Sequence, residues 1–147
     1  MPTTTSTEDY LERIYTLIQG KGYARVVDIA SSLQVQPSSV TKMIQKLDEQ
    51  ELVRYEKYRG LVLTSAGEAI ARAVRRRHLK MEEFLRMLGV AEPILQRDIE
   101  GLEHHLSLQT LECIRDLVSY FQQYPQRLEE FQAQRHPQCK PSEGSLG

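Results

Sequence analysis

The fold is decided by residues 26–47, which read VVDIASSLQVQPSSVTKMIQKL. Apolar residues follow the i, i+3, i+4, i+7 spacing of a helix on both sides of a short turn. They are Val26, Ile29, Ala30 and Leu33 before the turn, and Val40, Ile44 and Leu47 after it. Pro37 follows the turn, at the first helical position, where proline is tolerated. Two short helices joined by a tight turn predict a helix-turn-helix unit.

A β-hairpin is expected directly after this unit. Residues 52–58 and 61–64 contain β-formers with partial alternation, and Arg59 and Gly60 lie between them as a turn. A hairpin after a helix-turn-helix is the arrangement of a winged helix. Ser65 and Glu68 match a capping box, which predicts a long helix over residues 66–88 that stops at Gly89.

Further helices are predicted on either side of this winged helix. The first covers residues 7–19, with Thr7 as its cap and Gly20 and Gly22 at its end. Two more cover residues 92–106 and 108–123. The last of these has a broad apolar stripe, and a second subunit is the natural cover for it.

The expected fold is mainly α with a small β-hairpin. We expect an N-terminal winged helix-turn-helix domain at residues 1–70, a helical dimerisation domain at residues 71–124 and a flexible tail at residues 125–147. No run of eighteen apolar residues predicts a membrane span, and residues 1–7 lack a signal-peptide pattern. Two widely spaced cysteines do not predict a disulfide framework. We therefore expect a cytoplasmic protein.

The net charge of −1 hides an asymmetry between two parts of the chain. Residues 21–80 have twelve Lys and Arg against six Asp and Glu, whereas the rest of the chain has seven against fourteen. A basic part suits a polyanion, and an acidic part suits cations or a partner chain. Solvated faces would give the same asymmetry, so charge alone establishes neither a polyanion partner for the basic part nor a cation or protein partner for the acidic part.

Double-stranded DNA is the expected partner of the basic part. In the second helix of the helix-turn-helix unit, which begins at Pro37, hydroxyls and cations on the outer side can bind phosphates and base edges. Gln45 of this helix can pair with adenine. Cations and a ring at the hairpin tip suit contact with the DNA backbone or minor groove. The candidate residues are Pro37, Ser38, Ser39, Thr41, Lys42, Gln45 and Lys46 on the helix, and Lys57, Tyr58 and Arg59 at the tip. The alternative is a winged helix used only for contacts with proteins.

A metal site is indicated by Glu100, Glu103 and His104, which helical spacing places on one face. Two carboxylates and an imidazole without a thiol suit Mn²⁺ or Fe²⁺ more than a structural zinc. Asp9 and Glu12 repeat the three-residue spacing, and His78 lies midway along another predicted helix. Each group alone could be an ordinary solvated face. Together, four carboxylates and two imidazoles could hold two adjacent divalent ions.

The sequence gives little indication of a catalytic activity. The carboxylates and histidines could assist metal-dependent hydrolysis. However, the chain has no glycine-rich phosphate loop, nucleophile elbow or HExxH motif. We therefore expect no enzyme, and keep a hydrolase as the remote alternative. A winged-helix repressor that senses a small organic ligand is a second rival.

Four segments resemble the manganese-responsive members of the diphtheria toxin repressor family of metal-dependent repressors. They are residues 22–26 (GYARV), 37–43 (PSSVTKM), 55–64 (YEKYRGLVLT) and 100–106 (EGLEHHL). The resemblance covers roughly residues 5–124. It does not extend to the tail.

The resemblance implies a Mn²⁺-activated repressor of manganese uptake genes that binds a palindromic operator as a homodimer. The family's ligands for two ions per subunit match Asp9, Glu12, His78, Glu100, Glu103 and His104. Iron-responsive relatives have methionine at the position of Asp9 and cysteine at that of Glu100. Oxygen donors in place of sulfur favour Mn²⁺ over Fe²⁺, although another divalent metal, iron or zinc, remains an alternative.

Overall fold

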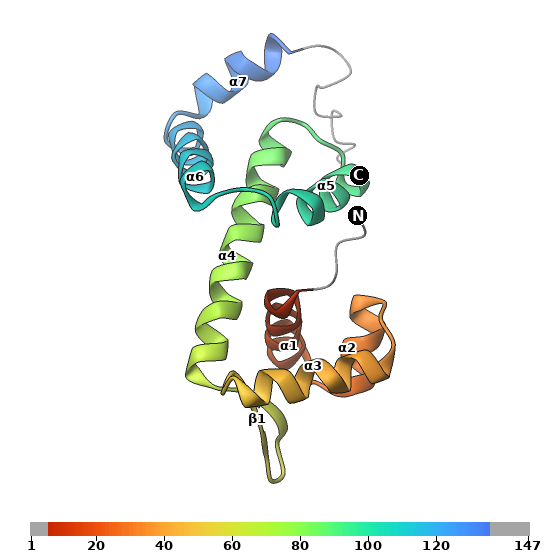
Figure 1. Ribbon diagram of the computed structural model, residues 1–147. Helices are drawn as coiled ribbons and strands as arrows, with labels where there is room; N and C mark the ends of the chain where they lie inside the picture. The colour runs from red at the N-terminus through yellow and green to blue at the C-terminus, as the bar shows by residue number, and fades with distance from the viewer. Residues whose placement is uncertain (1–5, 136–147) are drawn as a thin grey trace. The chain divides into compact units, whose positions relative to one another are not determined.

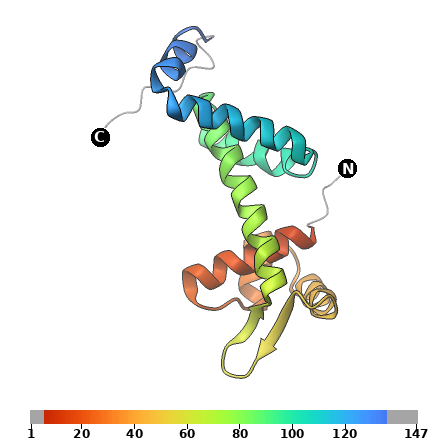
Figure 2. The same ribbon diagram turned by 90° about the vertical axis from the view of Figure 1, so that its left-hand side faces the viewer.

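The computed structural model describes residues 6–135 (Figures 1 and 2). Contacts divide the chain into two compact units, Met1–Arg75 and Arg76–Gly147, whereas the sequence predicted a boundary at residue 70. The elements, in chain order, are α1 (Thr7–Lys21), α2 (Val26–Leu33), α3 (Pro37–Glu49), β1 (Val53–Glu56), β2 (Gly60–Leu63), α4 (Ser65–Met87), α5 (Glu92–Leu102), α6 (Leu108–Gln123) and α7 (Pro125–Ala133).

Helix α1 begins with a capping box made by Ser6 and Asp9. The Asp9 N–H donates to the Ser6 hydroxyl, and the Asp9 carboxylate accepts from the Ser6 N–H at 3.0 Å. Thr7, which was expected to be the cap, is the first helical residue, so that prediction is wrong by one position. Gly22 ends the helix with φ 84°, as predicted, but Gly20 lies within it.

The helix-turn-helix is confirmed as α2 and α3. Between them Gln34 adopts the left-handed conformation, and the N–H of Val35 donates to the carbonyl of Ala30 at 3.0 Å. Pro37 occupies the first turn of α3. The predicted apolar stripes pack into one core with α1, in which the fully buried side chains include Leu11, Ile14, Ile29, Val40 and Leu47.

The hairpin is shorter than the β-forming segments, but its place is as predicted. Strands β1 and β2 pair antiparallel, with Val53 opposite Leu63 and Glu56 opposite Gly60. Val53 and Leu61 are buried in the core of α1–α3, so one face of the hairpin anchors it while the loop at residues 57–59 projects away (Figure 2).

Helix α4 is capped by Thr64, whose hydroxyl accepts from the N–H of Gly67 at 3.1 Å. The expected cap, Ser65, is instead the first helical residue. Gly67 packs directly against the carbonyl of Leu52, with which a β-carbon at this position would clash. The predicted stop at Gly89 is confirmed by its positive φ of 83°.

The second unit has its own apolar core. Met81 and Leu85 of α4 pack with Leu95 and Ile99 of α5, and all four are buried. Helix α5 ends at Leu102 and not at residue 106, because residues 103–105 form a turn. The premise that Glu100, Glu103 and His104 share one helix is therefore wrong for the last two. The turn stays near helical geometry, since the Glu103 N–H still donates to the Ile99 carbonyl at 2.9 Å.

The first part of the segment that was expected to be a flexible tail, Pro125–Ala133, forms the helix α7. Pro125 takes the N-terminal position that proline tolerates, and so begins a helix. The ring of Phe131 lies 5.8 Å from that of Phe121 on α6, and the Gln132 amide donates to the Met87 carbonyl. The remainder of the expected tail, residues 136–147, lies outside the described residues. No helix within residues 6–135 is long and apolar enough to cross a bilayer.

Candidate nucleic-acid interface and metal-binding cluster

The outer face of α3 presents every helix residue that was predicted to contact DNA. Val40, Ile44 and Leu47 hold the opposite face in the core, so this helix cannot rotate without exposing them. The exposed residues are Pro37, Ser38, Ser39, Thr41, Lys42, Gln45 and Lys46. The hydroxyl of Thr41 donates to the Pro37 carbonyl at 3.1 Å, which leaves its oxygen available as an acceptor.

The loop between β1 and β2 presents Lys57, Tyr58 and Arg59, all exposed. Tyr58 is 95% exposed at a positive φ of 75°, a conformation that tyrosine rarely adopts. The Lys57 ammonium lies 5.3 Å from the centre of its ring. Arg59 is tied to Glu56 at 3.3 Å, so this guanidinium is partly neutralised within the hairpin.

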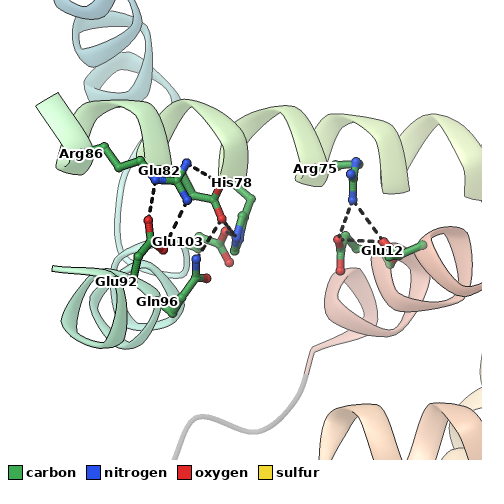
Figure 3. Close-up of polar contacts among 9 residues, drawn as sticks. Glu12, Arg75, His78, Glu82, Arg86, Glu92, Gln96 and Glu103 are labelled. Atoms are coloured by element: carbon green, nitrogen blue, oxygen red, sulfur yellow. Dashed lines mark hydrogen bonds and ion pairs between the residues drawn. The ribbon is translucent and has the colours of Figure 1, made fainter. Parts of the chain in front are cut away.

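Two of the six candidate metal ligands lie on α1, in the N-terminal unit. Asp9 and Glu12 are both half-buried. The Asp9 carboxylate belongs to the capping box, and the Glu12 carboxylate accepts from the Thr16 hydroxyl at 3.1 Å. Arg75 lies 3.9 Å from the same oxygen of Glu12, a charge compensation that sequence reasoning did not identify (Figure 3).

The other four lie in the C-terminal unit, where the structure brings three together. Nδ1 of His78, on α4, lies 2.5 Å from Oε1 of Glu103. A carboxylate oxygen of Glu103 and a ring nitrogen of His104 lie within 4.8 Å of each other. Glu100 is exposed on the last turn of α5, three residues before Glu103.

Glu103 is the one buried charged residue of the described chain, with 9% of its surface exposed. A buried carboxylate needs a compensating cation or hydrogen bonds, and His78 supplies a hydrogen bond here. The hydrogen bond to Glu103 raises the pKa of His78 above its usual value, against the opposing effect of burial. The charges of Glu103 and Glu82 raise the pKa of His78 further.

Carboxylate oxygens and imidazole nitrogens are the donors of this cluster, and no sulfur is among them. Such a donor set fits a divalent ion of the Mn²⁺ or Fe²⁺ type. The hydrogen bond between His78 and Glu103 holds both side chains in positions from which they could bind a cation.

Sequence reasoning missed Glu82, which lies one helical turn after His78 on α4. Its Oε1 is 3.1 Å from Nε2 of His78 and accepts from the Gln96 amide at 3.1 Å (Figure 3). Arg86 lies 3.5 Å from its other oxygen. The i, i+4 spacing from His78 was the signal that could have revealed this residue.

Comparison with known proteins decides the family. Residues 2–61 match the family model described as iron dependent repressor, N-terminal DNA binding domain, and residues 64–132 match the one described as iron dependent repressor, metal binding and dimerisation domain. The chain belongs to the iron-dependent repressor family. Its members are transcriptional regulators, so the expectations of a DNA-binding repressor and of no enzyme are confirmed.

Individual members of the iron-dependent repressor family agree with this assignment. The chain is 58% identical over 129 residues to the HTH-type transcriptional regulator MntR of Geobacillus kaustophilus (strain HTA426), covering 88% of this chain and 91% of the relative. Identity is 52% over 141 residues to MntR of Bacillus velezensis, covering 96% and 99%.

The solved structure of the manganese regulator SloR matches 80% of this chain with a TM-score of 0.71 and 30% identity. This chain spans only 55% of that structure's length. The two family models confirm the domains that the sequence predicted. These are the winged helix-turn-helix and the helical metal-binding and dimerisation domain.

Proposed function

We propose that this repressor is activated by Mn²⁺, acts in the cytoplasm, and binds a palindromic operator as a homodimer to repress manganese uptake genes. The observation that carries the proposal is the contact between the buried Glu103 and the half-buried His78, in a donor set without sulfur. It is supported by relatives that are called MntR and by the solved manganese regulator SloR.

The proposed ligands are Asp9, Glu12, His78, Glu100, Glu103 and His104, for two Mn²⁺ ions per subunit. The assignment rests on the family resemblance and on donor chemistry. Mn²⁺ takes up to six oxygen and nitrogen donors and prefers carboxylates to thiolates, so four carboxylates and two imidazoles suit it. A bound divalent ion would neutralise the negative charge that these carboxylates otherwise concentrate.

Metal control of DNA binding would follow from how the ligands are distributed. Asp9 and Glu12 belong to α1, which packs in the same core as α2 and α3. The other four belong to the metal-binding domain. We propose that joint ligation couples the two domains of each subunit. The two winged-helix domains of the dimer would then be held at the spacing of the two half-sites of the operator. The metal then acts through a higher affinity for the DNA-competent state, and DNA must tighten metal binding equally.

The proposed DNA contacts are the outer face of α3 and the tip of the hairpin. On α3 the hydroxyls near the N-terminus and Gln45 would reach base edges, while Lys42 and Lys46 would neutralise phosphates. Lys57, Tyr58 and Arg59 would meet the backbone or minor groove.

A homodimer fits the apolar surface left on α6 and its end. Leu108 is 73% exposed, and Leu117, Tyr120 and Tyr124 are large apolar side chains that are exposed as well. The matched domain is described as a dimerisation domain. Two identical heads read a palindrome, because the two-fold axis of the dimer coincides with that of the operator.

Fluorescence anisotropy of the chelator-stripped protein tests the proposal. Duplexes are first selected from genomic DNA of the source organism by the Mn²⁺-loaded protein, and are then titrated with Mn²⁺, Fe²⁺, Zn²⁺ or chelator present. Tight binding with Mn²⁺ and weak binding with chelator is expected. Equal binding in all conditions would overturn metal control, and stronger activation by Fe²⁺ or Zn²⁺ would overturn the choice of metal.

The variants Glu103→Gln and Glu83→Gln sharpen this experiment. Both remove one carboxylate charge from the metal-binding domain, but Glu83 is bound to Lys80 at 3.1 Å and is not a proposed ligand. Only Glu103→Gln should abolish the response to Mn²⁺. A normal response in Glu103→Gln would favour a repressor that senses a small organic ligand.

A further inference from the structure

We propose that Glu82 is a positioning residue, which holds the His78 ring so that Nδ1 is presented to the metal. The inference rests on the proposed function, in which His78 and Glu103 are ligands. Glu82 itself is not among the proposed ligands.

The two nitrogens of His78 face two different carboxylates. Nδ1 lies 2.5 Å from Oε1 of Glu103, and Nε2 lies 3.1 Å from Oε1 of Glu82 (Figure 3). Glu103 is a proposed ligand, so the nitrogen that faces it is the one on the side of the metal. Nε2 is on the other side of the ring, where it faces Glu82.

An imidazole ring that binds a metal through one nitrogen carries its proton on the other. A carboxylate that accepts this proton fixes the tautomer and the ring orientation, and makes the ligating nitrogen a stronger donor. Glu82 is placed to accept from Nε2, which assigns the lone pair of Nδ1 to the metal.

Glu82 is held in place by its own contacts. Its side chain is 15% exposed, and Oε1 accepts from the Gln96 amide of α5 at 3.1 Å. Arg86 lies 3.5 Å from Oε2 and is itself tied to Glu92 of α5 at 2.7 Å. These contacts hold the carboxylate between α4 and α5.

The same contacts argue against Glu82 as a ligand. The guanidinium of Arg86 places a positive charge beside the oxygen that does not contact His78, and this charge repels a divalent cation. Its other oxygen is shared by His78 and Gln96. Glu82 therefore acts through His78.

The test measures Mn²⁺ affinity by competition with a fluorescent chelator, in the full chain without DNA. Glu82→Leu removes the acceptor at similar size, Glu82→Gln keeps an oxygen acceptor without the charge, and Glu83→Leu is the control on the same helix. We expect Glu82→Leu to weaken binding roughly 10–100-fold, Glu82→Gln to weaken it less, and Glu83→Leu to leave it unchanged. Equal losses for Glu82→Leu and Glu83→Leu would overturn the proposal.

The His78→Ala background separates positioning from ligation. Glu82→Leu should weaken Mn²⁺ binding no further there, because Glu82 acts only through the ring. An equal loss in both backgrounds, or a lost Mn²⁺ equivalent in Glu82→Leu alone, would make Glu82 a ligand or a structural residue and overturn the proposal. If His78→Ala itself binds Mn²⁺ normally, the ligand set of the proposed function fails first.

A spectroscopic measurement covers the case in which Glu82→Leu folds poorly. In the protein loaded with diamagnetic Cd²⁺, long-range ¹H–¹⁵N spectra should show a protonated Nε2 and a metal-bound Nδ1 for His78. The Nε2 proton should lose its strongly hydrogen-bonded shift in Glu82→Gln. A metal-bound Nε2 in the wild-type chain would overturn the assignment.

Discussion

Nδ1 of His78 lies 2.5 Å from Oε1 of Glu103, and this contact joins the middle of α4 to the turn that follows α5. It pairs the buried carboxylate of the metal-binding domain with an imidazole whose pKa the same carboxylate raises. The two side chains that are proposed to share a metal are thus in direct hydrogen-bond contact with each other.

The first prediction concerns the pH dependence of the metal-free protein. Folding raises the pKa of His78, so its bond to Glu103 stabilises the fold fully below the unfolded-state pKa, near 6.5. This contribution, on the order of 1 kcal/mol, disappears as the pH rises through the higher folded-state pKa. Urea unfolding between pH 5 and 9 should therefore show a gap between the wild type and Glu103→Gln that narrows as the pH rises. A gap that widens with pH would contradict the raised pKa.

The second prediction separates the two roles of Asp9. Asp9→Met replaces a hard oxygen donor by a soft sulfur, so activation by Mn²⁺ should fall relative to activation by Fe²⁺ in anaerobic DNA-binding titrations. The substitution also breaks the capping box of α1. Ser6→Ala is the matched control, because it should cost about 1 kcal/mol of stability through the cap while leaving the metal preference intact. An unchanged Mn²⁺ to Fe²⁺ ratio in Asp9→Met would exclude Asp9 as the discriminating ligand.

The third prediction concerns Lys42 on the outer face of α3. Lys42→Ala should weaken operator binding and make the plot of log K against log salt less steep, by about 0.9 for each phosphate that is no longer neutralised. Its Mn²⁺ affinity without DNA should not change. Lys80→Ala removes a cation that is bound to Glu83 on α4, and should leave the salt dependence as it is. A lower Mn²⁺ affinity in Lys42→Ala would show that this face is not reserved for DNA.

The fourth prediction concerns stability alone. Gly67→Ala should destabilise the fold by about 2–4 kcal/mol in thermal unfolding, since the added β-carbon would clash with the Leu52 carbonyl and the backbone must shift. Gly20→Ala, within α1, has open space around the added carbon and should stabilise by roughly 0.5–1 kcal/mol. Equal effects of the two variants would show that the approach of α4 to Leu52 is not tight.

The winged helix could be predicted because its signals are local. The spacing of Ile29, Val40 and Ile44 is that of two buried helix faces, and Pro37 marks where the second helix begins. The caps were missed by one residue at Ser6 and Thr64, since neighbouring hydroxyl residues compete for the same N–H groups and only the backbone path selects one.

The amino-acid sequence by itself determined the elements, the core stripes and the donor types of the candidate site, because helical periodicity and side-chain chemistry belong to single residues and their near neighbours. Tertiary structure decided where α5 ends, that residues 125–133 are helical, and which carboxylate meets which nitrogen of His78. Glu103 and Glu82 have the same side-chain chemistry, and their packing alone decides which nitrogen of His78 each one contacts. The physical reason is that burial and hydrogen-bond partners depend on contacts between α4 and α5, such as Gln96 with Glu82, which no local pattern encodes.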